Sequence, residues 1–305
     1  MLSLLLCLSF ALPSSTSQDS ATLGRQESAT GIRHSFVISG PRTVAVGETN
    51  EITWDLEGSS RFAVRLAGGN FLVVYGQHAV ELTAAKEEVW RYEVSAPNTE
   101  LMGGERLPNG MTLLTEMGPR PRLVEVNGEG QIAHEIPIEP ETDNVHMQSR
   151  MSTKLKGGTY LVAHRLMPFA KEYDREGKVL MTMRTDGAAL GGSEARNGTF
   201  SALRLSNGNT LITCTTGNKV VELDPSGKPI WVVTSAEVGG IINDVCGLQR
   251  LKNGNVVVSC YGNQGSDDIK MFEITRDKQV VWSYYAPSVR SIHTLQILST
   301  NGTPE

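Results

Sequence analysis

Side chains able to act as acids, bases or nucleophiles are spread along the chain and form no single motif. Cys246 would be a nucleophile if His293 served as its base, and His146 and Asp244 would form an acid/base pair if the fold joined them. Each interpretation has a structural alternative. A thiol in an apolar segment is commonly a small buried hydrophobic group, and loop histidines and aspartates commonly satisfy backbone groups. Proximity in the fold therefore decides whether these residues do chemistry.

A second group of side chains is suited to binding. Arg61 and Arg150 would hold an anionic ligand through charge-assisted hydrogen bonds, and surface ion pairs are their alternative role. Glu116 and His164 are further ligand-binding candidates. With Cys214 and Cys260 they include metal-ligand types, but they lie in separate repeats, too far apart to share one ion. The sequence therefore predicts no metal site.

One phrase is repeated along the chain and identifies the elements that must position these residues. A leucine precedes an Asn-Gly or Gly-Gly turn, then come an apolar run, a Val-x-Val or Val-x-Leu segment and an aromatic end. Asn and Gly accept the positive φ of tight hairpins, so each unit predicts a four-stranded antiparallel sheet. The leucines are Leu66, Leu107, Leu155, Leu205, Leu251 and Leu298, and the aromatic positions are Trp54, Trp90, His134, Met181, Trp231 and Trp282.

The order of these positions shows that the repeat is circularly split. Trp54 precedes the first repeat leucine, and Leu298 has no outer strands after it. The segment from Phe36 to Trp54 supplies the outer strands of the unit whose inner strand runs from Ser291 to Leu298. A β-propeller closes its ring by such pairing of its two ends. The sequence predicts an all-β, six-bladed β-propeller with four-stranded antiparallel blades over residues 34–305. A linear β-solenoid, the alternative, gives no reason to split the repeat.

Two runs carry a resemblance to known propellers. The Asp-x-x-Gly-Lys-x-x-Trp run from Asp224 to Trp231 resembles the tryptophan-docking repeats of PQQ-like propellers. The run at 205–212 is similar to repeats of arylsulfotransferase-like and NHL-like bacterial propellers. The resemblance covers residues 34–305 and implies the fold, but no catalytic residue. No cofactor is predicted. Quinoprotein dehydrogenases typically have eight blades and a calcium site, whereas this chain has six repeats and no acidic cluster with calcium-ligand spacing, which argues against PQQ.

Propeller geometry predicts where the candidate residues meet. The first strand of a blade starts, and the second ends, at the same mouth of the central channel, and such a concave mouth suits a ligand. His146 and Asp244 lie just upstream of the first of two predicted rings of residues. The first-strand ring contains Arg61, Met102, Arg150, Phe200, Cys246 and His293, and the second-strand ring contains Ser39, Tyr75, Glu116, His164, Cys214 and Cys260.

The N-terminal segment predicts export. Leu2 to Leu12 is an almost unbroken apolar run, too short to span a bilayer, and Ser15 to Ser17 supply the small residues that a signal peptidase reads. We interpret residues 1–17 as a signal peptide, 18–33 as a flexible polar leader, and the protein as secreted or periplasmic. A disordered apolar tail or a retained anchor is the alternative.

Charge and composition narrow the function without fixing it. The net charge is -5, no basic block suggests nucleic acid, and no other stretch is long enough for a transmembrane helix. One function class is an exported binding module that takes a protein, glycan or small molecule at the mouth. The other is a hydrolase, lyase or transferase active at the channel. A quinone-dependent oxidoreductase is a third class, disfavoured by the repeat number.

Overall fold

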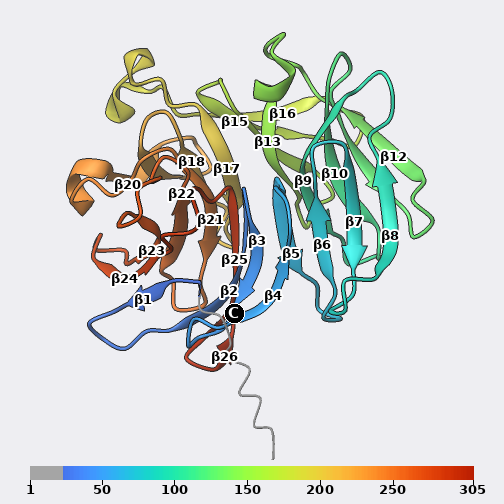
Figure 1. Cartoon of the computed structure of the whole chain (residues 1–305). Helices are drawn as coiled ribbons and strands as arrows, with labels where there is room; N and C mark the ends of the chain where they lie inside the picture. Colours follow the sequence, from blue (N-terminus) through green and yellow to red (C-terminus); the bar gives the residue numbers. More distant parts are fainter. Residues whose placement is uncertain (1–22) are drawn as a thin grey trace, which may run out of the picture.

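The structure, a computed structural model, describes residues 23–305 and is built almost entirely of β-sheet (Figure 1). Six antiparallel sheets form the blades of a ring, four with four strands and two with five. Five of the blades follow one another along the chain, and the sixth combines strands from both ends of the described chain.

The first three blades share one order of strands from the channel outward. Blade 1 contains β5 (Phe62–Arg65), β6 (Phe71–Val74), β7 (His78–Leu82) and β8 (Glu88–Glu93). Blade 2 contains β9 (Glu100–Arg106), β10 (Thr112–Met117), β11 (Arg122–Val126) and β12 (Ile132–Pro137). Blade 3 contains β13 (Ser149–Lys154), β14 (Tyr160–His164), β15 (Phe169–Tyr173) and β16 (Val179–Arg184).

The other three blades complete the ring. Blade 4 contains β17 (Thr199–Arg204), β18 (Thr210–Cys214), β19 (Lys219–Leu223) and β20 (Pro229–Thr234). Blade 5 contains β21 (Val245–Arg250), β22 (Val256–Cys260), β23 (Ile269–Ile274), β24 (Val280–Tyr285) and, at its outer edge, β1 (Arg25–Glu27). Blade 6 contains β25 (Thr294–Thr300), β2 (His34–Ser39), β3 (Thr43–Val46) and β4 (Ile52–Leu56), with β26 (Thr303–Pro304) beside β25. The connections of the described chain hold four short 3-10 helices: η1 (Val145–Met147), η2 (Ala188–Leu190), η3 (Ser193–Ala195) and η4 (Ser235–Val238).

The ring is closed around a channel. Each inner strand contacts the next, in the order β5, β9, β13, β17, β21, β25 and back to β5. These six strands line a cavity of about 570 Å³ in the centre of the molecule. The predicted six-bladed propeller is confirmed.

The predicted closure is confirmed as well. In blade 6, β2 pairs antiparallel with β25 from Ser39 opposite Thr294 to His34 opposite Thr300. Figure 1 shows β2 in blue beside β25 in red. Because this pairing joins strands from distant parts of the chain, it leaves no inner strand without a neighbour.

The repeated aromatic positions join neighbouring blades. The indole nitrogen of Trp90 in blade 1 donates to the carbonyl of Asn127 in blade 2 at 2.8 Å. Trp231 in blade 4 donates in the same way to Arg276 in blade 5 at 2.8 Å. His134, at the matching position of blade 2, contacts the carbonyl of Arg175 at 3.1 Å. At three of the six repeat positions, this residue thus holds its sheet against a turn of the next blade.

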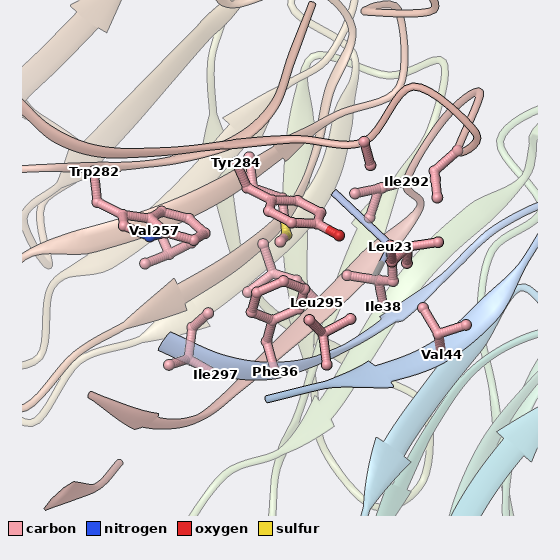
Figure 2. Packing of buried hydrophobic residues seen from close by; sticks show 14 of the residues in the cluster. Leu23, Phe36, Ile38, Val44, Val257, Trp282, Tyr284, Ile292, Leu295 and Ile297 are labelled. Atoms are coloured by element: carbon pink, nitrogen blue, oxygen red, sulfur yellow. The ribbon is translucent and has the colours of Figure 1, made fainter. Parts of the chain in front are cut away.

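The flexible leader predicted for residues 18–33 is wrong for the part that the structure describes. Arg25–Glu27 forms β1, which pairs with β24, and Leu23 is buried. Leu23 belongs to an apolar cluster between blades 5 and 6, where Figure 2 shows it close to Ile38 and Val44 of blade 6. The polar composition did not indicate this role, because only two buried side chains, Leu23 and Gln26, attach the segment to the propeller. Residues 1–22, with the predicted signal peptide, lie outside the described residues.

Gln26 is the polar centre of this anchor. Its side-chain oxygen accepts from the backbone N–H of His34 and from the indole of Trp282, both at 2.8 Å. Its amide nitrogen donates to the carbonyls of His34 at 3.0 Å and Glu48 at 3.3 Å. One buried side chain therefore satisfies groups from blades 5 and 6.

Within residues 23–305, no helix has the length and apolar character needed to cross a membrane.

Replacing Gln26 by Ala tests the importance of this anchor. We expect Gln26→Ala to lower the free energy of unfolding by about 2–4 kcal/mol, because it leaves buried donors of Trp282 and His34 without acceptors. Arg25→Ala, on the same strand with its side chain half exposed, is the matched control and should change stability by less than about 0.5 kcal/mol. Urea unfolding followed by tryptophan fluorescence measures both. Equal losses in the two variants would contradict the anchor role.

Candidate functional site

One cavity at a mouth of the channel gathers most of the predicted site residues. Its volume is about 210 Å³. His146 and Asp244 lie in its wall, as do Met147, Arg165, Thr215 and Tyr261. The whole predicted first-strand ring also lines it: Arg61, Met102, Arg150, Phe200, Cys246 and His293. Inner-strand positions that are equivalent in the repeat thus converge on one small space.

Bulges in the inner strands aim several of these side chains. In blade 3, Ser149 pairs with His164 and Ser152 with Val162, so Arg150 and Met151 together face a single residue of β14. Such an extra residue bends a strand and redirects its side chains. The same irregularity occurs in blades 2, 4 and 5, and its first residue lines the cavity each time: Met102, Phe200 and Cys246.

Hydroxyl groups on the second strands support two of these bulges. The backbone N–H of Ser201 donates to Thr213 Oγ1, and that of Gly247 donates to Ser259 Oγ, both at 2.9 Å. A bulge removes a backbone partner, so a buried hydroxyl at this place keeps the N–H satisfied. Thr213 and Ser259 each lie one residue before the end of the second strand of their blade. A Thr or Ser at this position is a sequence signal for the bulge that the sequence analysis missed.

The predicted second-strand ring does not belong to the cavity wall. Glu116 and His164 lie inside their blades, with fully buried side chains. Side chains alternate along a strand, so a shift of one residue moves every member to the other side. The residues one position further along, Arg165, Thr215 and Tyr261, line the cavity instead. The ring that lies outside the wall comprises Ser39, Tyr75, Glu116, His164, Cys214 and Cys260.

Glu116 is held in a closed polar network. Its carboxylate accepts from Tyr92 Oη at 2.5 Å, Ser95 N at 3.0 Å, Asn98 Nδ2 at 3.0 Å and Arg122 Nε at 2.7 Å. Burial alone would raise the pKa of Glu116, but these hydrogen bonds outweigh it and hold the pKa below its usual value. Glu116 is ionised, and its carboxylate oxygens already accept these hydrogen bonds, so the residue suits a structural role.

His164 is also a packing residue. Its Nε2 contacts Tyr173 Oη at 3.0 Å in the interior of blade 3. Burial, with the nearby charge of Lys171, lowers the pKa of His164 to about 3. The imidazole is therefore neutral at pH 7 and faces the blade core.

The three cysteines of the described chain are buried free thiols: Cys214, Cys246 and Cys260. Cys246 Sγ donates to the carbonyl of Asp244 at 3.3 Å, and burial raises the pKa of its thiol far above the usual range. In the described region, no hydrogen bond joins Cys246 to His293. A nucleophilic thiolate needs a lowered pKa and an adjacent base, so the geometry does not support the predicted nucleophile.

The predicted pairing of His146 with Asp244 is replaced by a different one. His146 Nδ1 contacts Glu100 Oε2 at 3.0 Å, and Arg61 Nη1 lies 2.6 Å from the same oxygen. Burial opposes ionisation of Glu100, but the bonds to His146 and Arg61 outweigh it and lower its pKa. Asp244 takes a left-handed backbone conformation with φ of 46°, and its backbone N–H donates to Asn218 Oδ1 at 2.8 Å. Both residues line the cavity, but as members of separate contacts.

Arginines dominate the charge of the wall. Arg150 is 5% exposed, and its Nη1 donates to the backbone carbonyls of His146 and of Ser149, the latter at 2.9 Å. Its Nη2 contacts the sulfur of Met147 at 3.5 Å. Across residues 23–305, no carboxylate forms an ion pair with Arg150. Burial, with the charges of Arg165 and Arg61, lowers its pKa to about 9, so it is still cationic at pH 7.

Arg165, which sequence reasoning missed, adds a second cation without a partner. Its Nη1 is buried and has no hydrogen-bond partner in the described part of the chain. With Arg61, which pairs with Glu100, and Arg150 it gives the wall three guanidinium groups, and Asp244 supplies the one carboxylate of the wall. The arrangement favours an anion over a cation or a neutral molecule. Among the described residues, no group of three or more His, Cys, Asp or Glu side chains is placed to hold a metal ion.

Aromatic rings form another part of the wall. The rings of Tyr261 and His293 are parallel, with centroids 5.0 Å apart and an interplanar angle of 6°. His293 also stacks on Phe200 at 6.5 Å, and Arg150 Cζ lies 5.7 Å from the centre of the Phe200 ring. Burial, with the charges of Arg150 and Arg61, lowers the pKa of His293 to about 4.

Comparisons with known proteins define the class of fold. No family model and no curated protein sequence matches the chain. A protein of unknown function from Bacteroides caccae superimposes with a TM-score of 0.75 and 22% identity, over 86% of this chain and 98% of that one. A streptogramin B lyase superimposes with a TM-score of 0.60 and 12% identity, over 90% and 89% of the two chains. The WD40 propeller domain of Doa1 gives 0.56 and 12%, over 86% and 85%.

These likenesses concern the fold alone, because identity is low in each case. The chain is a six-bladed β-propeller with an arginine-rich cavity at one channel mouth. The finer resemblance to PQQ-like and arylsulfotransferase-like repeats stays a prediction.

Proposed function

We propose that this propeller binds a small anionic ligand in the cavity at the channel mouth. One observation carries the proposal: Arg150 is almost fully buried, lines the cavity and has no carboxylate partner in the described chain. A buried charge without a counter-charge destabilises a fold strongly. Such a residue is retained most simply when a ligand supplies the missing charge.

The surroundings of Arg150 support an anion of low molecular weight. The protein as a whole carries a net charge of -5, so general attraction of anions is not expected and the positive potential is local to the wall. Arg165 offers a second free donor, and Arg61 a third cation already paired with Glu100. At about 210 Å³, the cavity is smaller than the ~300–1,000 Å³ typical of sites for drug-sized ligands. A small molecule therefore fits better than a protein loop or glycan chain.

Replacing Arg150 by Met tests this proposal. We expect Arg150→Met to abolish the binding of acetate, phosphate or sulfate, while the unliganded protein is as stable as the wild type or about 1–2 kcal/mol more stable. The reason is that the variant removes an uncompensated buried charge while keeping an apolar stem. Calorimetric titration in low-chloride buffer measures binding, and urea unfolding measures stability.

Arg184→Met is the matched control for this experiment. Arg184 lies on β16 of the same blade, is exposed, and pairs with Asp186 away from the mouth. This variant should bind the anions as the wild type does. If none of the three anions gives heat that depends on Arg150, the proposal is wrong.

One contact favours an enzyme as a second candidate function. The ionised Glu100 only accepts hydrogen bonds, so His146 donates to it through Nδ1. With Nδ1 as this donor, Nε2 is the ring nitrogen that can exchange a proton at the edge of the cavity. A carboxylate that orients a histidine in this way is a recurring arrangement in general-base catalysis. The streptogramin B lyase is an enzyme of this fold, but at 12% identity it supports no residue role here.

The acid/base function is tested with 4-nitrophenyl hydrogen succinate, an ester that carries one carboxylate. An active general base predicts saturable hydrolysis in which His146→Gln lowers kcat about 100-fold or more and changes KM little. His78→Gln, on β7 in the outer part of blade 1, is the control and should keep full activity. Hydrolysis by the wild type that is no faster than by His146→Gln would exclude this role for the probe reaction.

Export is also a proposal, and it rests on the apolar run in residues 2–12 of the sequence. Expression of the full chain in a secreting host should give a protein outside the cytoplasm that begins near Gln18. N-terminal sequencing and intact mass measure this directly. A cytoplasmic product with residues 1–17 still attached would contradict both the signal peptide and the secreted or periplasmic location.

A further inference from the structure

Three consecutive blades contribute rings to one column in the cavity wall. Phe200 comes from β17 of blade 4, Tyr261 follows β22 of blade 5, and His293 precedes β25 of blade 6. Tyr261 and His293 lie parallel at 5.0 Å, and His293 and Phe200 stack at 6.5 Å. Because three separate elements hold these rings, the column is a rigid feature of the propeller core.

Tyr261 lies at one end of the column, and part of its apolar surface is exposed. It is 36% exposed although it lines the cavity, whereas Phe200 is only 5% exposed. Other large apolar side chains that are exposed in the described structure lie away from this wall: Val89, Leu166, Leu180, Ile230 and Val280. An exposed aromatic ring inside a concave site is a typical stacking surface for a ligand.

The column is uncharged at neutral pH. The pKa of His293 is about 4, since burial and the charges of Arg150 and Arg61 oppose its protonation. The wall therefore combines two kinds of surface. Guanidinium groups are suited to an anionic group, and the neutral aromatic column next to them offers a flat surface.

We propose that the ligand is a planar aromatic anion, with its ring against Tyr261 and its anionic group at Arg150 and Arg165. This inference rests on the proposed anion-binding function and adds the class of molecule. A cavity of about 210 Å³ limits the ligand to one ring or a small fused system. In this proposal, stacking on the aromatic column selects ligands with a planar ring, and the arginines select ligands with a negative charge.

Two pairs of probes test the inference, each combining an aromatic anion with its saturated analogue. They are benzoate with cyclohexanecarboxylate, and phenylphosphonate with cyclohexylphosphonate. Calorimetric titration of the full chain in low-chloride buffer should show the aromatic member of at least one pair binding about fivefold to tenfold more tightly than its saturated partner. Tyr261→Leu should remove this preference, whereas Tyr261→Phe, which keeps the ring, should retain it. Thermal melts confirm that both variants are folded.

The possible results separate the two proposals. If both members of each pair bind equally, and Arg150→Met abolishes the binding, the anion-binding function stands and the aromatic ligand class is wrong. If the aromatic preference survives in Tyr261→Leu, the assignment to this ring is also wrong. If no probe gives heat that depends on Arg150, the anion-binding function itself fails, and this inference fails with it.

Discussion

The hydrogen-bonded pairing of β2 with β25 is the constraint on which the rest of the structure depends. It supplies the outer strands of blade 6, so that the inner strands of all six blades form a closed circle. Without it, β25 would keep only the two-residue β26 as a paired neighbour, and β2 would have an open edge. Closure also has a polar component. His34 Nε2 lies 2.9 Å from Glu273 Oε2, both side chains are fully buried, and Gln26 links the same region to Trp282. Because these buried polar groups must meet their partners, the contacts fit only one alignment of β2 with β25.

A closed ring gathers equivalent positions of the repeat around one cavity. Scaffold positions such as the hairpin glycines and the docking tryptophan perform the same task in several blades, whereas the inner-strand positions at the mouth carry different chemistry in each blade. Because the ring brings equivalent positions together, Arg61, Arg150 and His293 meet although they are far apart in the sequence. The bulges refine this arrangement by turning one more side chain per strand toward the channel. The connections between strands complete the wall with further residues, among them His146, Asp244 and Tyr261.

The buried charge in the cavity wall is held differently from most buried charges in the scaffold. Glu116 contacts Arg122 and Lys171 contacts Glu139, whereas Lys270 is held by the backbone carbonyls of Asn263 and Gly265. Arg150 is equally hidden from solvent but is held only by backbone carbonyls and a methionine sulfur. A protein that tolerates such a group at a concave site sacrifices some stability there, which is a common property of functional sites.

The sequence was sufficient to predict the number of blades, the hairpin turns, the split repeat and the first-strand ring. These features repeat, and each has a local physical cause, such as the positive φ of Gly208 or the apolar strand that follows it. The second-strand ring was wrong: in three blades the residue after the predicted position lines the cavity instead, because side chains alternate along a strand. The partner of His146, the buried position of Leu23 and the missing partner of Arg150 depend on contacts between distant segments. Local sequence patterns do not encode such contacts, so the folded ring alone decides which polar groups of the described chain have partners and which have none.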